Sequence, residues 1–363
     1  MKTIADIFRL FGPEYIARFK HSMPSNHHKV IKSILDCKTA ESGIAIYECR
    51  DCGKTYQVYR SCGNRHCPQC QHHKTLMWVQ KQFERRLPGH HFMATFTVPE
   101  HIRSFIRSHQ RIAYSAMFES SSGALKKLAA DERFIGGDLP GFFGVLHTWG
   151  RKLQFHPHIH YIVPGGAISR HDKRWHPSRL DFYVPIRALS KIYREKFKHI
   201  MIREGLYSDI PSDVWKLDWN VNIQPIGNSE NSIRYLAPYV FKVAISNSRI
   251  IKIDGRDITF RYKKGRSNRF RHITLDAIEF IRRYLQHVLP TGFMKIRYYG
   301  FLHPCSSIPL DDIRIRIEIA YGFIIKTTEI DQEKIPIPVC PFCGGHLIFF
   351  ASILPCGFVY RSG

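Results

Sequence analysis

The spacing of the cysteines constrains this chain more than any other feature of its sequence. Cys49-x2-Cys52 and Cys67-x2-Cys70 are two knuckles separated by fourteen residues, a spacing typical of a zinc site with four thiolate ligands. The segment around them contains little apolar material, so it cannot bury enough surface to fold alone. Zinc binding would supply the missing free energy of folding. The sequence therefore predicts a structural zinc module near the N-terminus.

Six further cysteines leave the number of zinc ions open. Cys37, Cys62 and His66 lie close to the knuckles and are candidates for a second zinc site. A third knuckle, Cys340-x2-Cys343, lies in the tail of the chain. The residues that compete to complete a tail zinc site with it are Cys356, His346 and Cys305.

Composition indicates a nucleic-acid partner. The 363 residues carry a formal net charge of +24, which favours a polyanion. The N-terminal segment lacks the continuous apolar stretch of a secretory signal, and no run of about 18 apolar residues predicts a membrane span. We therefore expect a cytoplasmic, nucleoid-associated protein, in which paired thiols bind metal rather than form disulfides. No glycine-rich phosphate loop is present, so no nucleotide cofactor is expected.

The apolar pattern predicts an α+β fold with a largely antiparallel central sheet flanked by helices. The expected strands are 91–98, 142–148, 155–163 and 221–225, and a hairpin is expected over 249–262 around Asp254-Gly255. The expected helices are 1–35, 100–117, 122–130, 187–204 and 275–289, the last capped by Thr274.

Three domains are expected from these changes of character. They are a helical and zinc-binding DNA-recognition domain over 1–85, a catalytic domain over 86–300, and a small tail with a zinc knuckle over 301–363.

Two histidines in one expected strand are candidate metal ligands. His158 and His160 are two positions apart, so they share one face of the strand, about 6–7 Å from each other. His147, eleven residues before His158, lies on the preceding strand and could bind the same ion, whereas His156 and Gln154 compete with it. Neutral imidazole accepts Mn, Co, Ni or Zn as well as Mg. Such an ion would polarise a phosphate.

Two tyrosines further along the chain are candidate nucleophiles. Tyr235 and Tyr239 are four positions apart, so on a helix they share a face. Pro238 would kink that helix or make the two phenols unequal. A phenol has a pKa near 10 and needs activation to attack at neutral pH. The alternative interpretation is a pair of core aromatic residues.

A dense basic run is the candidate DNA-binding surface. Aromatic residues at Phe260, Tyr262 and Phe270 interleave with it and could stack on unpaired bases. Its basic residues are Arg261, Lys263, Lys264, Arg266, Arg269 and Arg271.

The order of these motifs resembles that of the rolling-circle HUH transposases of bacterial insertion sequences, specifically the insertion-sequence ninety-one type. The resemblance covers about 31–302 and rests on the zinc knuckles, His147-Thr148-Trp149-Gly150, the His156–His160 motif and Tyr235-x3-Tyr239 with the following Val243–Asn247. It implies an HUH nuclease fold.

That resemblance also implies an activity on single-stranded DNA at the ends of a transposon. A tyrosine would attack a phosphodiester, with Mg(II) or Mn(II) bound by the histidines, and leave a 5′-phosphotyrosine and a free 3′-hydroxyl. A second tyrosine would permit a second transfer. A plasmid replication initiator or relaxase of the same fold is the nearest alternative, and a non-catalytic, zinc-dependent DNA-binding protein is another.

Overall fold

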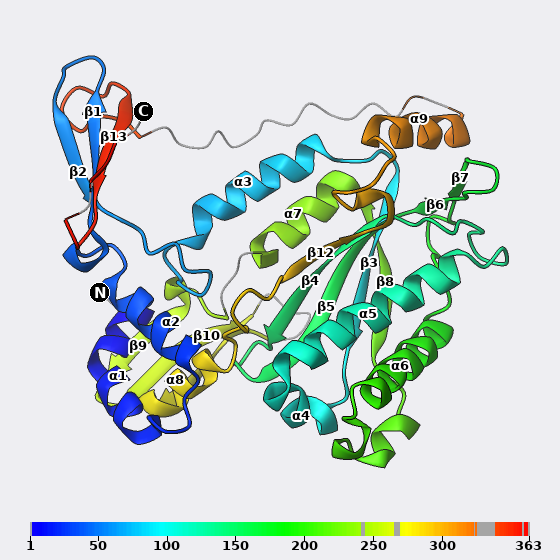
Figure 1. Ribbon diagram of the computed structural model, residues 1–363, viewed down its shortest axis with the longest axis horizontal. Helices are drawn as coiled ribbons and strands as arrows, with labels where there is room; N and C mark the ends of the chain where they lie inside the picture. The colour runs from blue at the N-terminus through cyan, green and yellow to red at the C-terminus, as the bar shows by residue number, and fades with distance from the viewer. Residues whose placement is uncertain are drawn as a thin grey trace.

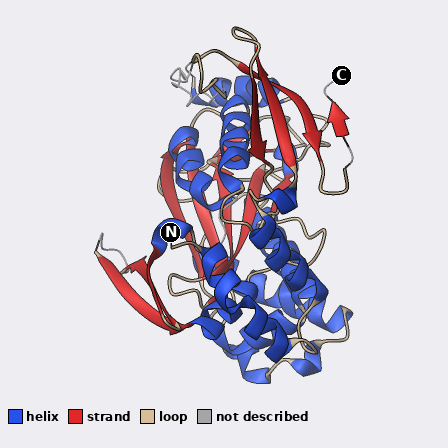
Figure 2. Cartoon of the chain, turned by 90° about the vertical axis from the view of Figure 1, so that its left-hand side faces the viewer, coloured by secondary structure: helices blue, strands red, loops and turns tan. Residues whose placement is uncertain are grey.

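The computed structural model describes residues 2–240, 244–264, 269–322, 324, 338–357 and 359–361. Within helices and strands, the side chains at 72, 232, 235–239, 360 and 361 lie outside this description. Figure 2 shows that the strands gather in separate groups with helices packed between them. Helices and sheets are therefore mixed, as the α+β prediction requires.

A five-stranded antiparallel sheet forms the centre of the molecule, with strand order β12-β4-β5-β3-β8. Its strands are β3 (His90–Thr97), β4 (Phe142–Trp149), β5 (Phe155–Pro164), β8 (Val221–Asn228) and β12 (Ile296–Tyr299). A small hairpin of β6 (Gly166–Ile168) and β7 (Trp175–Pro177) follows β5. The antiparallel sheet predicted from sequence is confirmed.

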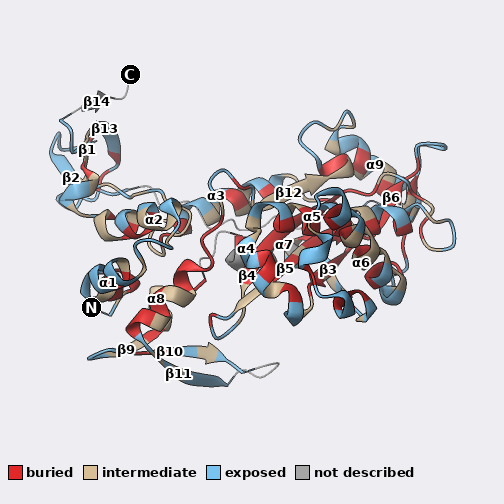
Figure 3. Ribbon diagram, turned by 60° about the horizontal axis from the view of Figure 1, so that its bottom comes forward, coloured by how far each residue is buried: buried red, intermediate tan, exposed pale blue. Residues whose placement is uncertain are grey.

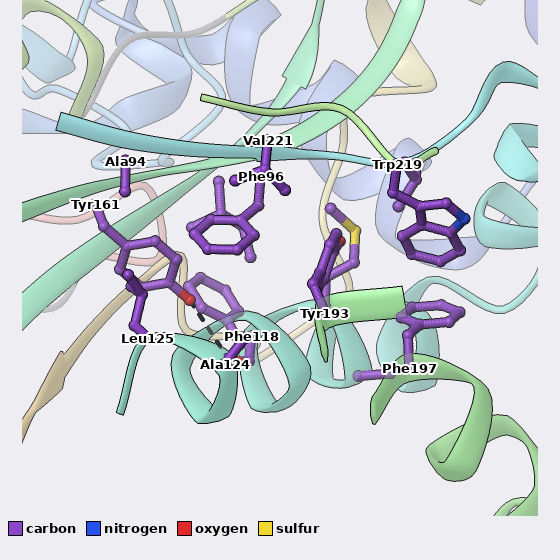
Figure 4. Close-up of a cluster of buried hydrophobic side chains, with 14 of the residues drawn as sticks. Ala94, Phe96, Phe118, Ala124, Leu125, Tyr161, Tyr193, Phe197, Trp219 and Val221 are labelled. Carbon is purple, nitrogen blue, oxygen red and sulfur yellow. Dashed lines mark hydrogen bonds between the residues drawn. The ribbon is translucent and has the colours of Figure 1, made fainter. Parts of the chain in front are cut away.

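Helices α4 (Arg103–Ser108), α5 (Gln110–Ala129) and α6 (Ile186–Arg203) lie against one face of this sheet. Alternate residues of the strands supply the core there, because successive side chains point to opposite faces. Figure 4 shows Phe96 and Tyr161 from the sheet packed with Phe118, Tyr193 and Trp219. Burial of each such side chain contributes roughly 1.5–3 kcal/mol. This face is a closed hydrophobic core.

The opposite face carries α3 (Gln71–Glu84), α7 (Ser229–Val240) and α9 (Leu310–Tyr321). Phe143, Val145 and Ile162 of the sheet pack there with Trp78 of α3 and Ile233 of α7. His147, His158 and His160 have the same strand parity as these residues. The histidines therefore lie on the face that carries α7.

The N-terminal helices pack against elements from much later in the sequence, which include a second sheet of order β11-β10-β9. The elements of this body are α1 (Ile4–Phe19), α2 (Ser25–Asp36), β9 (Ile250–Asp254), β10 (Asp257–Lys263), β11 (Phe270–Asp276) and α8 (Ala277–Leu285). Phe8 meets Tyr284 edge to face at 5.4 Å between ring centroids, and Thr3 closes a capping box with Asp6 at the start of α1. Packing therefore crosses the boundary expected at residue 85.

Strands from residues 44–59 and from residues 347–361 form one four-stranded sheet, of order β14-β13-β1-β2. Its strands are β1 (Ile44–Cys49), β2 (Thr55–Tyr59), β13 (Leu347–Ile353) and β14 (Val359–Arg361). We call this sheet the zinc ribbon. Within the segment expected as a tail over 301–363, α9 packs beside the β6–β7 hairpin and β13 pairs with β1. No helix in the described ranges is long and apolar enough to cross a membrane.

Candidate metal centres and active site

The first cysteine cluster consists of Cys37, Cys62, Cys67 and Cys70. Its sulfur atoms lie close together, with Cys37 Sγ 3.3 Å and Cys62 Sγ 3.5 Å from Cys70 Sγ. A tetrahedral ion bound at about 2.3 Å to each thiolate holds its sulfurs at roughly these separations. Cys37 and Cys67 are buried in the core formed by α1, α2 and α8. The donor set fits one structural zinc ion.

The second cysteine cluster consists of Cys49, Cys52, Cys340 and Cys343. Cys49 ends β1, and its Sγ lies 3.5 Å from Cys343 Sγ, while Cys52 Sγ lies 3.8 Å from Cys340 Sγ. Only a small apolar cluster supports this site, formed by Cys49, Cys340 and Leu347 with Tyr47 against it. Two knuckles from opposite ends of the chain thus form a second tetrathiolate site, at one end of the zinc ribbon.

This arrangement corrects the grouping expected from sequence. Cys49 and Cys52 do not share a cluster with Cys67 and Cys70 in the described structure, because β1 pairs with β13 and brings the tail knuckle to the first knuckle. Cys37 and Cys62 join Cys67 and Cys70 in one cluster that could hold a metal ion.

The remaining candidate ligands lie elsewhere. His66 Nε2 accepts a hydrogen bond from the Leu289 backbone at 3.3 Å and is not part of either cysteine cluster. Cys356, expected in the tail site, is exposed and outside both clusters, as is Cys305. His346 contributes a backbone carbonyl that accepts from Arg50. Cys340 and Cys343 therefore find their partners in the N-terminal knuckle instead.

The third cluster is the histidine triad, His147, His158 and His160, whose ligand atoms lie within 4.8 Å of one another. His158 on β5 pairs directly with His147 on β4, so the two side chains share a face. His160, two positions along β5, lies with its ring centroid 4.9 Å from that of His147 and 4.8 Å from that of His158. The strands therefore converge three imidazoles on one point.

Hydrogen bonds fix two of these rings. His158 Nδ1 donates to the His156 carbonyl at 2.7 Å, and His160 Nδ1 bonds to Thr95 Oγ1 of β3 at 2.9 Å. Both bonds leave Nε2 available to a metal, an arrangement that orients metal-binding histidines in general. Burial lowers the pKa of His158 to about 3 and that of His160 to about 4. Both imidazoles are therefore neutral, as a ligand must be.

The two competitors for the third ligand position are not members of the triad. The ligand atoms of His156 do not join the cluster that the described residues form. Gln154 accepts a hydrogen bond from the Lys152 backbone at 2.9 Å. Of the three candidates, His147 is the one that the structure brings to His158 and His160.

The candidate tyrosines lie on α7. The backbone at positions 235 and 239 is α-helical and continues through Pro238, whereas the side chains of Tyr235 and Tyr239 lie outside the described residues. Ile233 and Val240 anchor the helix in the core on the histidine-bearing face of the sheet. The structure therefore places the helix, but not the phenols, on the side of the sheet that carries the triad.

The basic run lies on the β10–β11 hairpin, and Figure 3 colours most of β11 as exposed. Arg261 and Lys263 lie 5.2 and 5.8 Å from the ring centroid of the exposed Phe270. Arg266 lies outside the described residues. The other basic residues that the structure leaves exposed here are Lys264, Arg269 and Arg271.

Thr95 is a residue of the site that the sequence does not reveal. It lies on β3, opposite His160, in a strand that otherwise supplies core residues. A hydroxyl at an otherwise apolar strand position is a weak signal by itself, and its role is evident only from the register of β3 and β5.

Comparison with known proteins shows similarity to transposases. Residues 141–308 match a family described as "Putative transposase", and residues 7–98 match a family described as "Transposase zinc-binding domain". A "Putative transposase y4qJ" from Sinorhizobium fredii is 35% identical over 82% of this chain and 80% of its own length. The "Transposase for insertion sequence element IS801" from Pseudomonas savastanoi pv. phaseolicola is 26% identical over 90% of this chain and 83% of its own length. No solved structure gives a significant match.

A DNA-processing protein with a cysteine-rich zinc module is the class that the fold and these matches define. Within that class, the chain belongs to the transposase family of the insertion-sequence ninety-one type, the family that its order of motifs resembles.

Proposed function

We propose that this transposase nicks and rejoins single-stranded DNA at the ends of its element, in a rolling-circle type of transposition that proceeds through a 5′-phosphotyrosine intermediate. The observation that carries the proposal is the convergence of His147, His158 and His160 on the sheet face that also carries α7. An HUH nuclease requires a pair of metal-binding histidines on a strand, together with tyrosines on a nearby helix.

The triad is suited to a divalent metal ion. Its three donors are nitrogens, two of them oriented by hydrogen bonds, and no carboxylate joins the cluster among the described residues. Imidazole donors suit Mn, Co, Ni or Zn better than Mg, which prefers oxygen ligands. A bound ion would polarise the scissile phosphate and neutralise charge in the transition state. We expect Mn(II) to support activity at lower concentration than Mg(II).

The chain itself supplies the nucleophile. The phenol oxygen of Tyr235 or Tyr239 would form a bond to phosphorus while the bond from phosphorus to the 3′ oxygen breaks. The phenol proton leaves to solvent or a base, and the 3′ oxygen departs as a hydroxyl. The phosphotyrosine bond conserves the free energy of the cleaved phosphodiester, so the free 3′-hydroxyl can reverse the attack on another strand without a nucleotide cofactor.

The β10–β11 hairpin would hold the DNA strand. Arg261 and Lys263 flank Phe270 on its exposed face, so cations can neutralise phosphates while the ring stacks on a base. The net charge of +24 adds a long-range attraction.

Incubation with a labelled oligonucleotide tests this function. A single strand from the end of the element, mixed with the protein and Mn(II) or Mg(II), is expected to yield a protein–DNA adduct that survives SDS. EDTA should abolish the adduct, and the same sequence as a fully paired duplex should give little. Absence of an adduct with every terminal sequence and both metals would refute the proposed chemistry.

A further inference from the structure

A cavity of about 280 Å³ lies at the end of β4. Its wall combines the residues between Cys62 and Cys67, the start of α3, the end of β4, the end of α7, the end of α8 and the segment before β12, together with Ala244. Trp149 lines the cavity and also contacts the triad, because its ring centroid lies 5.2 Å from that of His147. The Trp149 ring therefore lies between a ligand in the cavity and His147 of the triad.

The cavity contains a buried acceptor without a partner. Gln71, the first residue of α3, is only 6% exposed and lines the cavity. Its Nε2 donates to the Asn64 carbonyl at 2.7 Å, but its Oε1 has no hydrogen-bond partner among the described residues. Buried polar atoms are almost always paired, so this oxygen is placed to accept a hydrogen bond from a group that enters the cavity.

Other polar groups of the wall are already engaged. The Arg65 guanidinium donates to the carbonyls of Phe293 and Pro290, and His287 bonds to Thr148 Oγ1 at 3.2 Å. Apart from His66 and Lys295, the rest of the wall is apolar or aromatic, including Leu146, Trp149, Ala244 and Phe293. The site therefore suits a flat apolar group with a polar edge.

We propose that the cavity accepts one unpaired nucleobase of the DNA strand, next to the scissile phosphate, with Gln71 Oε1 accepting an N–H of that base. The inference rests on the proposed function, because it assumes that a single strand crosses the triad. An apolar cavity of about 150 Å³ already holds benzene, and pockets for whole small ligands begin near 300 Å³. The volume thus fits one base rather than a longer segment of the strand.

Charge and aromatic contacts support the same occupant. The Lys295 ammonium lies 4.8 Å from the Trp149 ring centroid, so positive charge beside the cavity would attract the phosphate attached to the base. Trp149 and Phe293 offer ring surface on which a base can stack. A base in this position would fix the register of the strand and so help to choose which phosphate reaches the triad.

A scan with abasic sites tests the cavity without any protein variant that alters it. Binding of terminal oligonucleotides is measured by fluorescence anisotropy on the full chain with Tyr235→Phe and Tyr239→Phe, so that no cleavage occurs. Removal of one base beside the cleaved phosphate should weaken binding by about ten-fold or more, and removal of bases further away by much less. A profile with no such position would overturn the proposal.

Two variants and a matched control then assign the effect to the cavity. Gln71→Met keeps the size of the side chain but removes the acceptor, and should reduce the preference for the intact base by roughly 2- to 10-fold. Ala244→Leu partly fills the cavity and should nearly abolish the preference. The control is Gln82→Met, a substitution in the same helix, equally buried but bonded to Tyr298 instead, and it should keep the preference.

The outcomes separate the cavity from the chemistry. Zinc content and thermal unfolding show whether Ala244→Leu is folded, and if it is not, the abasic scan and Gln71→Met still decide. A folded Ala244→Leu protein that keeps the full preference for the intact base would contradict the proposal. If wild-type protein forms no adduct while the double tyrosine variant shows the abasic profile, the nicking function is refuted and the base-binding cavity is supported.

Discussion

The histidine triad and the second cysteine cluster are built in opposite ways. The triad takes its ligands from two adjacent strands, within residues 147–160, and its strands are part of the central sheet. The second cysteine cluster joins Cys52 to Cys340, which is 288 residues further along the chain, and little apolar surface supports it. The triad is thus a site that the fold orients in advance, whereas the zinc ribbon depends on its metal.

Because of this difference, we expect the triad to affect the proposed reaction and the second cysteine cluster to affect the stability of the fold. A ligand set fixed by a packed sheet can lose one member without loss of the fold, because Phe143, Val145 and Ile162 continue to hold the strands. The second cysteine cluster itself joins β1 to the C-terminal tail, so it cannot lose a ligand without loss of this connection. Variants of the two kinds of site should therefore fail in different assays.

The largest effect is expected at the triad. His160→Ala removes a proposed metal ligand from a half-buried strand position and should slow adduct formation by roughly 10²- to 10³-fold, as loss of one preorganised electrostatic group does. The melting temperature should change little. His156→Ala, on the same strand but outside the triad, is the control and should stay within a few-fold of wild type. Equal losses in the two variants would contradict the assignment of the ligands.

Substitution of the cysteines should change metal content and stability rather than chemistry. We expect two zinc ions per wild-type chain and one in either Cys62→Ser or Cys340→Ser, measured by elemental analysis. Cys62→Ser should lower the free energy of unfolding by roughly 3 kcal/mol or more, because its cluster is embedded in the core of α1, α2 and α8.

Cys340→Ser should instead release the tail. Limited proteolysis is expected to remove β13 from this variant, while the melting temperature of the main body is nearly unchanged. If both variants lowered the melting temperature equally, the first cysteine cluster and the zinc ribbon would not differ in their contribution to stability, and our account of them would be wrong.

A smaller effect is expected at Thr95, which we assign as a positioning residue. Thr95→Val keeps the shape but removes the hydroxyl that bonds to His160 Nδ1. The concentration of Mn(II) that gives half-maximal adduct formation should rise by about 10- to 100-fold, with the rate at saturating metal less affected. Thr95→Ser should restore the wild-type value. An unchanged metal requirement in Thr95→Val would show that the bond does not orient the ligand.

The smallest effect is expected on the hairpin. Lys263→Ala should weaken binding a few-fold for every single-stranded sequence and reduce the salt dependence by about 0.7, the amount expected for one phosphate contact. Lys252→Ala is the matched control, because Lys252 lies on the neighbouring strand but is paired with Asp254. An equal loss of salt dependence in both variants would place the DNA elsewhere.

The sequence predicts local features of this protein well and long-range pairing poorly. The His-x-His pair follows from strand periodicity, and the hairpin around Gly255 is confirmed, with a positive φ of 52° at that glycine. The partners of each cysteine knuckle could not be predicted, because any knuckle supplies half a site and the strand order decides which halves meet. The pairing of β1 with β13 determines that the knuckle of Cys49 and Cys52 meets the knuckle of Cys340 and Cys343.

Some errors have a local cause. The sequence predicts two helices over 100–117 and 122–130, but α5 runs from Gln110 to Ala129 without interruption. Ser120 and Ser121 donate to carbonyls one turn earlier in the helix, and Ser121 also bonds to Tyr161 of the sheet. Thr274 does not cap α8, because Asp276 accepts from the Ile278 backbone at 2.9 Å and starts the helix two residues later.

Peptide mapping of the adduct tests the central claim most directly. After reaction with a terminal single strand and Mn(II), nuclease trimming and proteolysis, mass spectrometry should find a nucleotide attached to the peptide that contains Tyr235 and Tyr239, with fragmentation locating it on one phenol. The same experiment with His158→Ala should yield only a trace. A nucleotide on a residue outside α7, or an equal yield from His158→Ala, would contradict the account of a tyrosine nuclease assisted by the histidine triad.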